Sequence, residues 1–201
     1  MGFRIFIACL LLHFSSSVLG QNFPSEVWHP GTIVLADQDT LKGEVKYDLS
    51  SDMVQIEING RVLTFSAKKL FFFEIDDVTI ENYRQFYVLP YEVSYNFKAP
   101  VIFEVVIEGR MTLLCREKIV VQNTRYSPYA TGTYSRRVLD YDYYVLDENG
   151  GIVEMRTKKK DVLTVLKRKE REIKQYISAN NLHVDKKTDL ARIIAFYNGL
   201  L

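Results

Sequence analysis

Apolar and polar positions alternate over short runs between residues 31 and 75, which predicts five β-strands there. Val54, Ile56 and Ile58 fall on one side of the third run, and polar turns separate the runs. Asn59-Gly60 favours a type I′ hairpin turn, because both residues tolerate positive φ. Short strands with tight turns predict a small antiparallel barrel or rolled sheet. The five strands are expected at residues 31–35, 41–47, 53–58, 61–65 and 70–75.

Five further strands are expected between residues 83 and 156. A strand over 83–89 is expected to end at Pro90, and strands over 101–107 and 111–121 flank a turn at 108–110. Residues 138–146 and 152–156 flank the turn at 147–151. Residues 122–137 have no apolar period and are expected to form a loop.

The spacing of apolar residues changes to a helical period after Thr157. One amphipathic helix is expected from there to about Ser178, and a last helix carries Leu190, Ile193 and Tyr197 on its inner side. The fold class is therefore α+β and mostly β: the barrel or rolled sheet, further β-hairpins and two C-terminal helices. The expected organisation is a signal peptide at 1–20, a β-barrel module at 21–80, antiparallel hairpins at 81–156, and helices packed on the sheet at 157–201.

Residues 1–20 have the three parts of a secretory signal peptide. Arg4 supplies the positive charge, residues 5–12 are an apolar run of eight, and small residues precede a cut before Gln21. The run is shorter than the roughly 20 residues that span a bilayer, and no later segment is apolar enough to do so. We therefore expect export to the periplasm, the outer envelope or the medium, without a transmembrane helix.

Composition narrows the class of protein. The 201 residues include 47% hydrophobic and 25% charged residues, which excludes a disordered or collagen-like chain. A formal charge of +1 argues against a nucleic-acid binder. Cleavage before Gln21 would leave one cysteine, Cys115, and therefore no intramolecular disulfide. The chain has no Asn-x-Ser/Thr sequon, so a bacterial cell envelope is the simpler compartment.

The motifs of common catalytic and cofactor sites are absent. The sequence has no G-x-S-x-G, no H-E-x-x-H and no phosphate-binding glycine loop, so we assign no catalytic, metal or cofactor-binding residue and expect no cofactor. Cys115 lies within a predicted strand as a small apolar residue. Two groups of carboxylates leave a glycoside hydrolase open: Glu74, Asp76 and Asp77, and Asp140 with Asp142.

Two features are candidates for binding. Six of the 13 tyrosines fall between residues 126 and 144, and tyrosine offers a flat apolar face with a hydroxyl to sugars or proteins. Residues 156–174 hold nine Lys/Arg and three Asp/Glu, a composition that suits anionic surfaces, although charge runs are commonly solvated. The candidate ligand-binding residues are Tyr126, Tyr129, Tyr134, Tyr141 and Tyr143, and the candidate anion-binding residues are Lys158, Lys159, Lys160, Lys167 and Arg168.

Several segments together resemble uncharacterised exported β-rich proteins of Bacteroidetes-type bacteria. They are Gly31-Thr-Ile-Val-Leu, Leu41-Lys-Gly-Glu-Val-Lys-Tyr47, Tyr83-Arg-Gln-Phe-Tyr87, Leu113-Leu-Cys-Arg-Glu117, Lys158-Lys-Lys-Asp161 and Tyr197-Asn198. The strand pattern of the N-terminal half is also similar to SH3-like or PRC-barrel-like modules. The resemblance implies an envelope location, and no known activity comes with it.

The function expected from the sequence is that of a non-enzymatic binding or assembly module of the cell envelope, whose partner is an envelope protein or a glycan. One alternative is an envelope glycan hydrolase that uses paired carboxylates. Another is a peripheral membrane protein that uses the basic segment 156–174.

Overall fold

The computed structural model describes residues 22–125 and 133–201. The expected signal peptide and the candidates Tyr126 and Tyr129 lie outside these residues. The strands form one open antiparallel sheet in the order β10-β9-β8-β7-β6-β5-β1-β2-β3-β4. The strands are β1 His29–Leu35, β2 Thr40–Asp48, β3 Met53–Ile58, β4 Arg61–Ser66, β5 Leu70–Asp77, β6 Asn82–Ser94, β7 Phe97–Ile107, β8 Met111–Arg125, β9 Thr133–Asp147 and β10 Ile152–Met155.

The predicted α+β class with a mostly antiparallel sheet and C-terminal helices is confirmed, and the rolled sheet does not close into a barrel. The predicted Asn59-Gly60 turn has φ of 51° and 77°, as type I′ requires. Neighbouring strands pair in chain order except at β1, which lies between β5 and β2. The expected boundary at residue 80 falls in the turn between β5 and β6, which pair directly, so the sheet is continuous across it.

One face of the sheet carries two apolar cores, one at each end. The first core lies in the N-terminal half, where the sheet rolls around side chains such as Ile56, Phe73 and Phe86. The second lies between β8, β9 and the helices, where Leu113 and Ile193 are fully buried. Burial of each such side chain stabilises the fold by about 1.5–3 kcal/mol.

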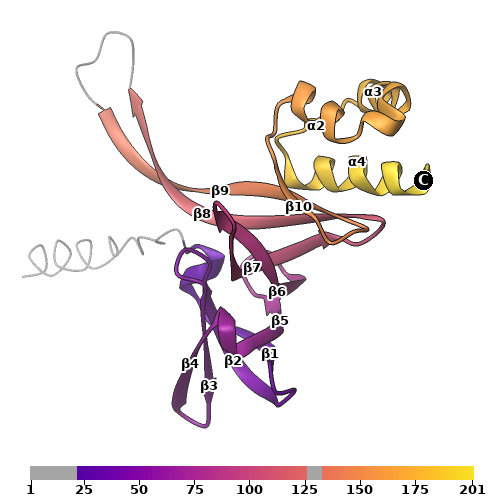
Figure 1. Cartoon of the computed structure of the whole chain (residues 1–201). Helices are drawn as coiled ribbons and strands as arrows, with labels where there is room; N and C mark the ends of the chain where they lie inside the picture. The colour runs from indigo at the N-terminus through magenta and orange to yellow at the C-terminus, as the bar shows by residue number, and fades with distance from the viewer. Residues whose placement is uncertain (1–21, 126–132) are drawn as a thin grey trace, which may run out of the picture.

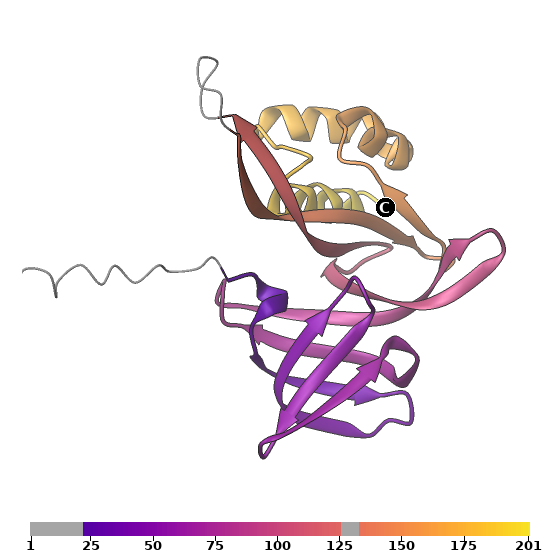
Figure 2. The same ribbon diagram turned by 90° about the vertical axis from the view of Figure 1, so that its left-hand side faces the viewer.

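The helices cover only the C-terminal half of the sheet (Figure 2). Helix α4 (Lys187–Gly199) lies against β7 and β8, and α3 (Glu170–Ala179) packs on α4. Helix α2 (Lys159–Val165) contacts β10 and α3. In the described part of the chain, no helix has the length and apolarity needed to cross a membrane.

The single helix predicted from Thr157 to Ser178 is wrong, because the short 3₁₀ turn η3 (Lys167–Lys169) interrupts it. Charge placement explains the break. The three basic residues of η3 follow the C-terminal end of α2, and Glu170 and Glu172 occupy the first turn of α3. The basic residues thus lie beside the partial negative charge at the C-terminal end of α2, and the glutamates lie beside the partial positive charge at the N-terminal end of α3. One continuous helix would have neither of these helix ends.

Two predicted strand ends are also wrong. Strand β6 continues through Pro90, which lies opposite Pro100, and neither residue pairs with a second strand in the described part of the chain. The missing N–H groups therefore interrupt no ladder. Residues 122–125 and 133–137, predicted as loop, pair with each other in β8 and β9. This two-stranded arm has exposed side chains at Gln122 and Asn123, so no apolar alternation marks it.

Gly43 allows β2 to approach β3 closely. A Cβ atom built at this position would lie 2.3 Å from the main-chain oxygen of Glu57, which real contacts do not permit. We expect Gly43→Ala to lower the free energy of unfolding by about 1–3 kcal/mol, as overpacking does in buried sites. Urea denaturation followed by circular dichroism measures this change.

Gly199→Ala is the matched control, because no atom of residues 22–125 or 133–201 lies within 4 Å of a Cβ built at that helical position. It should leave the free energy of unfolding unchanged or raise it by up to about 1 kcal/mol. Equal losses in the two variants would contradict the close approach of β2 and β3.

Candidate functional site

Arg84 on β6 lies at the centre of a buried cluster of charged side chains between the two apolar cores. Its Nη1 donates to the hydroxyl of Tyr47 at 2.7 Å and to Asp77 at 2.8 Å. Its Nη2 donates to Glu104 at 2.7 Å and to Glu117 at 2.8 Å. The guanidinium therefore joins β2, β5, β7 and β8 through one side chain that is only 3% exposed.

Lys187, at the start of α4, extends the cluster to the helices by donating to Glu104. Three carboxylates (Asp77, Glu104 and Glu117) thus face two cations, which leaves one negative charge in excess. His29, beside Asp77, does not supply a third cation. Its Nδ1 accepts from the N–H of Val78, so that nitrogen carries no proton.

The cluster sets the ionisation of its acids and of Cys115. Burial alone would raise the pKa of Glu104, but Arg84 and Lys187 outweigh it and hold that pKa below its ordinary value. For Asp77 burial is likewise outweighed, by hydrogen bonds from Thr79 and Arg84, and the pKa is lowered. Burial and the neighbouring Glu104 carboxylate raise the pKa of the Cys115 thiol, which suits a buried neutral side chain rather than a nucleophile.

Of the carboxylates named as hydrolase candidates, Glu74 and Asp76 line a small cavity of about 140 Å³ on one face of β5, whereas Asp77 lies on the buried face. Asp77 is 1% exposed and is held by Arg84, while Glu74 accepts a hydrogen bond from Tyr83. Asp140 and Asp142 share one exposed face of β9, and Lys118 makes ion pairs with both.

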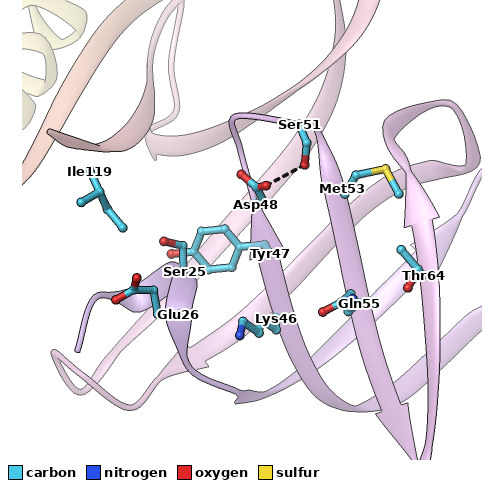
Figure 3. A pocket seen from close by; sticks show the side chains of 10 residues that line it. All are labelled: Ser25, Glu26, Lys46, Tyr47, Asp48, Ser51, Met53, Gln55, Thr64 and Ile119. Carbon is cyan, nitrogen blue, oxygen red and sulfur yellow. Dashed lines mark hydrogen bonds between the residues drawn. The ribbon is translucent and has the colours of Figure 1, made fainter. Parts of the chain in front are cut away.

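A cavity with a volume of about 480 Å³ lies beside the N-terminal strands (Figure 3). Lys46, Gln55 and Thr64 line it from β2, β3 and β4, where the register places them opposite one another. The remaining lining residues come from the 3₁₀ turn η1 (Pro24–Glu26), from β2 and β3 with the turn between them, and from β8: Ser25, Glu26, Tyr47, Asp48, Ser51, Met53 and Ile119.

Two carboxylates line this cavity, and both favour the ionised state. A hydrogen bond from Arg137 lowers the pKa of Glu26. For Asp48, burial is outweighed by hydrogen bonds from Ser50 and Ser51, and the pKa is lowered. A glycoside hydrolase needs one acid with a raised pKa to protonate the leaving group. Neither carboxylate fits that role, so the cavity suits binding better than acid catalysis.

Strand β4 borders the cavity and forms one edge of the sheet. Ile58 and Arg61 flank the two-residue turn, so they form the first hydrogen-bonded pair with β3. Hydrogen-bonded and non-hydrogen-bonded pairs alternate along an antiparallel ladder, so the N–H and C=O groups of Val62 and Thr64 point away from β3. Val62 and Leu63 are 50% and 43% exposed, and the strand has no charge after Arg61. Natural edge strands usually carry such charges to prevent pairing.

Of the five tyrosine candidates, the structure describes the side chains of Tyr141 and Tyr143, and neither is fully exposed. Tyr143 is 3% exposed and belongs to the core under the helices, where its hydroxyl has no partner among the described residues. Tyr141 is half-buried, and the centre of its ring lies 5.3 Å from the Nζ of Lys187. Tyr134 lies in β9, and its side chain is outside the described part.

The five candidate anion-binding residues lie on α2, its N-cap and η3, and all are exposed. In the described part of the chain, no carboxylate lies within 4 Å of their charged nitrogens. The structure therefore brings these five together on the helical layer.

The residues of the cavity and the edge were missed from the sequence. Lys46, Gln55 and Thr64 come from three strands, and their alignment depends on a register that only the Asn59-Gly60 turn signals. Arg84 was missed because a single arginine in an alternating strand is typical of an exposed position.

Comparison with protein-family models, with curated proteins and with solved structures found no match to this chain. The assignment of a function therefore rests on the geometry of the molecule.

Arg84→Met should lower the free energy of unfolding by about 3–5 kcal/mol at neutral pH, because it leaves three buried carboxylates without their shared cation. Lys187→Met, at the edge of the cluster, should cost about 1.5–3 kcal/mol and remain folded. Urea titrations of both variants test the ranking. A smaller loss for Arg84→Met than for Lys187→Met would contradict the central position of Arg84.

The cluster should also make stability fall in acid. The folded-state pKa values of Asp77 and Glu104 lie below the ordinary values of 3.8 and 4.5, so their stabilisation is complete above about pH 5.5. It is lost as the pH falls through the folded-state values. Removal of Lys187 raises the pKa of Glu104, so the loss should begin at a higher pH in Lys187→Met. Identical pH profiles for the two proteins would count against the ion pair.

Proposed function

We propose that the protein is a non-catalytic binding module of the cell envelope that takes an extended segment of a partner protein as an added strand along β4. The observation that carries this proposal is the position of β4, a nearly charge-free strand whose outer edge has no strand partner among the described residues, directly beside the 480 Å³ cavity. Addition of a strand to a sheet edge is a common mode of peptide recognition. Main-chain hydrogen bonds provide affinity, and pockets for alternate side chains provide specificity.

The edge offers two sets of contacts to such a segment. The outward N–H and C=O groups of Val62 and Thr64 can form four main-chain hydrogen bonds. Leu63 and Phe65 lie on the same face of the sheet as Val54 and Ile56 of β3. On this face, an apolar side chain of the partner would cover exposed hydrophobic surface of β4. On the face of Thr64 and Gln55, a partner side chain would reach the cavity.

The lining of the cavity favours a polar side chain with a negative charge. Lys46 has no carboxylate within 4 Å among the described residues, whereas Glu26 is paired with Arg137 and Asp48 is held by two serines. Lys46 is therefore the available cation, and Gln55 and Ser51 add amide and hydroxyl groups.

The proposal keeps the envelope location expected from residues 1–20. It is supported over the hydrolase alternative by the lowered pKa values of Glu26 and Asp48. It gives no role to nucleic acid, consistent with the low net charge.

Selection from a phage-displayed library of random peptides tests the proposal, with the affinity of the selected peptides measured by fluorescence anisotropy. The decisive variant is Thr64→Pro. It removes one outward N–H and places a ring where the added strand must lie, but it leaves the bonds from β4 to β3 intact. We expect the affinity of β4-binding peptides to fall about tenfold or more.

Thr64→Val is the matched control, because it changes the same side chain and keeps the N–H. Its affinity for the peptides should stay within about threefold of that of the unmodified protein. The free energy of unfolding of both variants should lie within about 1 kcal/mol of the unmodified value. Equal binding by Thr64→Pro, equal losses in both variants, or a selection that yields no specific peptide would overturn the proposal.

A further inference from the structure

The outermost layer of the C-terminal half consists of α2, η3 and α3 (Figure 1). We call residues 156–174 of this layer the basic cap. It holds nine Lys/Arg against three Asp/Glu, a net charge of +6. If residues 1–20 are removed, the rest of the chain carries −6. The charge of this protein is therefore strongly divided between two parts of the molecule although its sum is close to zero.

The fold directs the charges of the basic cap outward. Its apolar residues Val162, Leu166 and Ile173 are fully buried in the core above β8 and β9. Lys169 is half-buried, and the other eight basic residues of the cap are exposed: Arg156, Lys158, Lys159, Lys160, Lys167, Arg168, Arg171 and Lys174.

These cations are not neutralised within the molecule. In the ranges 22–125 and 133–201, no ion pair within 4 Å involves any of the nine. By contrast, Arg84, Arg116, Lys118 and Arg137 each contact a carboxylate. The field of the basic cap thus acts on whatever lies outside it.

The shape of the basic cap indicates a broad partner rather than a small ligand. None of its basic residues lines the 480 Å³ cavity or the second cavity, of about 370 Å³, on the opposite face of β6–β9. The cap also has no exposed large hydrophobic residue, so it has nothing to insert among acyl chains. A surface that carries many cations and has no pocket suits a partner whose anionic groups repeat over a wide area. A membrane with anionic headgroups is such a partner.

We propose that the basic cap adsorbs the protein onto the phosphate-bearing surface of an anionic membrane. Contact is electrostatic, with no side chain inserted into the hydrocarbon region. The β4 edge lies in the other half of the molecule and takes no part in this contact (Figure 2). This inference is independent of the proposed peptide binding, because the two surfaces share no residue.

Sedimentation with phosphatidylcholine vesicles that contain about 30 mol % phosphatidylglycerol tests the inference, with pure phosphatidylcholine as the reference. The protein should sediment only with the anionic vesicles, and about 500 mM NaCl should release it. Each basic residue near such a surface raises the partition coefficient of the protein between vesicle and solution about fivefold. The triple variant in which Gln replaces Lys158, Lys159 and Lys160 should therefore have a partition coefficient about a hundredfold lower.

Lys68, Lys69 and Lys98→Gln is the matched control, since it removes the same charge from three exposed lysines outside the basic cap. It should change the partition coefficient by less than about fivefold. No sedimentation with anionic vesicles, or equal losses in the two triple variants, would overturn the inference. So would binding of inorganic phosphate by the protein without any binding of vesicles.

Discussion

The buried guanidinium of Arg84 is the interaction on which the rest of the structure depends. It lies where the N-terminal apolar core meets the core under the helices, and it bonds to side chains from four strands. Through Glu104 and Lys187 the same network reaches α4. A buried cluster of this kind adds little net stability compared with apolar packing, but each member is costly to remove once the others are in place. We infer that the cluster around Arg84 holds the two halves of the sheet in one orientation.

That orientation leaves β4 as an edge. Because β1 is inserted between β5 and β2, the hairpin of β3 and β4 is placed at the end of the sheet, and the helices cover the opposite half. The other edge strand, β10, has only four residues and contacts α2. The asymmetry between a short edge beside a helix and a longer free edge beside a cavity favours binding at β4.

Much of the fold follows from local pattern. The five N-terminal strands and the Asn59-Gly60 turn lie where alternation and turn chemistry predict them. The two wrong strand ends occur where a local rule was overridden by the long-range arrangement of the sheet. Pro90 did not end a strand because no second neighbour needed its N–H, and the exposed arm of β8 and β9 needed no apolar face.

The candidate site was less predictable, because it depends on contacts between distant segments. Arg84 and Glu117 are 33 residues apart, and no periodicity pairs them. The cavity likewise depends on η1 and β8 lying beside β2, which strand patterns alone do not specify. The basic cap was visible in the composition, since its charges are contiguous in sequence.

Amide hydrogen exchange at Val62 and Thr64 tests the central claim most directly. In the free protein these two N–H groups should exchange rapidly, while those of Leu63 and Phe65, bonded to β3, are protected. A bound extended peptide should protect Val62 and Thr64 without changing the amides of β10. Protection of Val62 and Thr64 in the free protein, or rapid exchange there while the peptide is bound, would contradict the account.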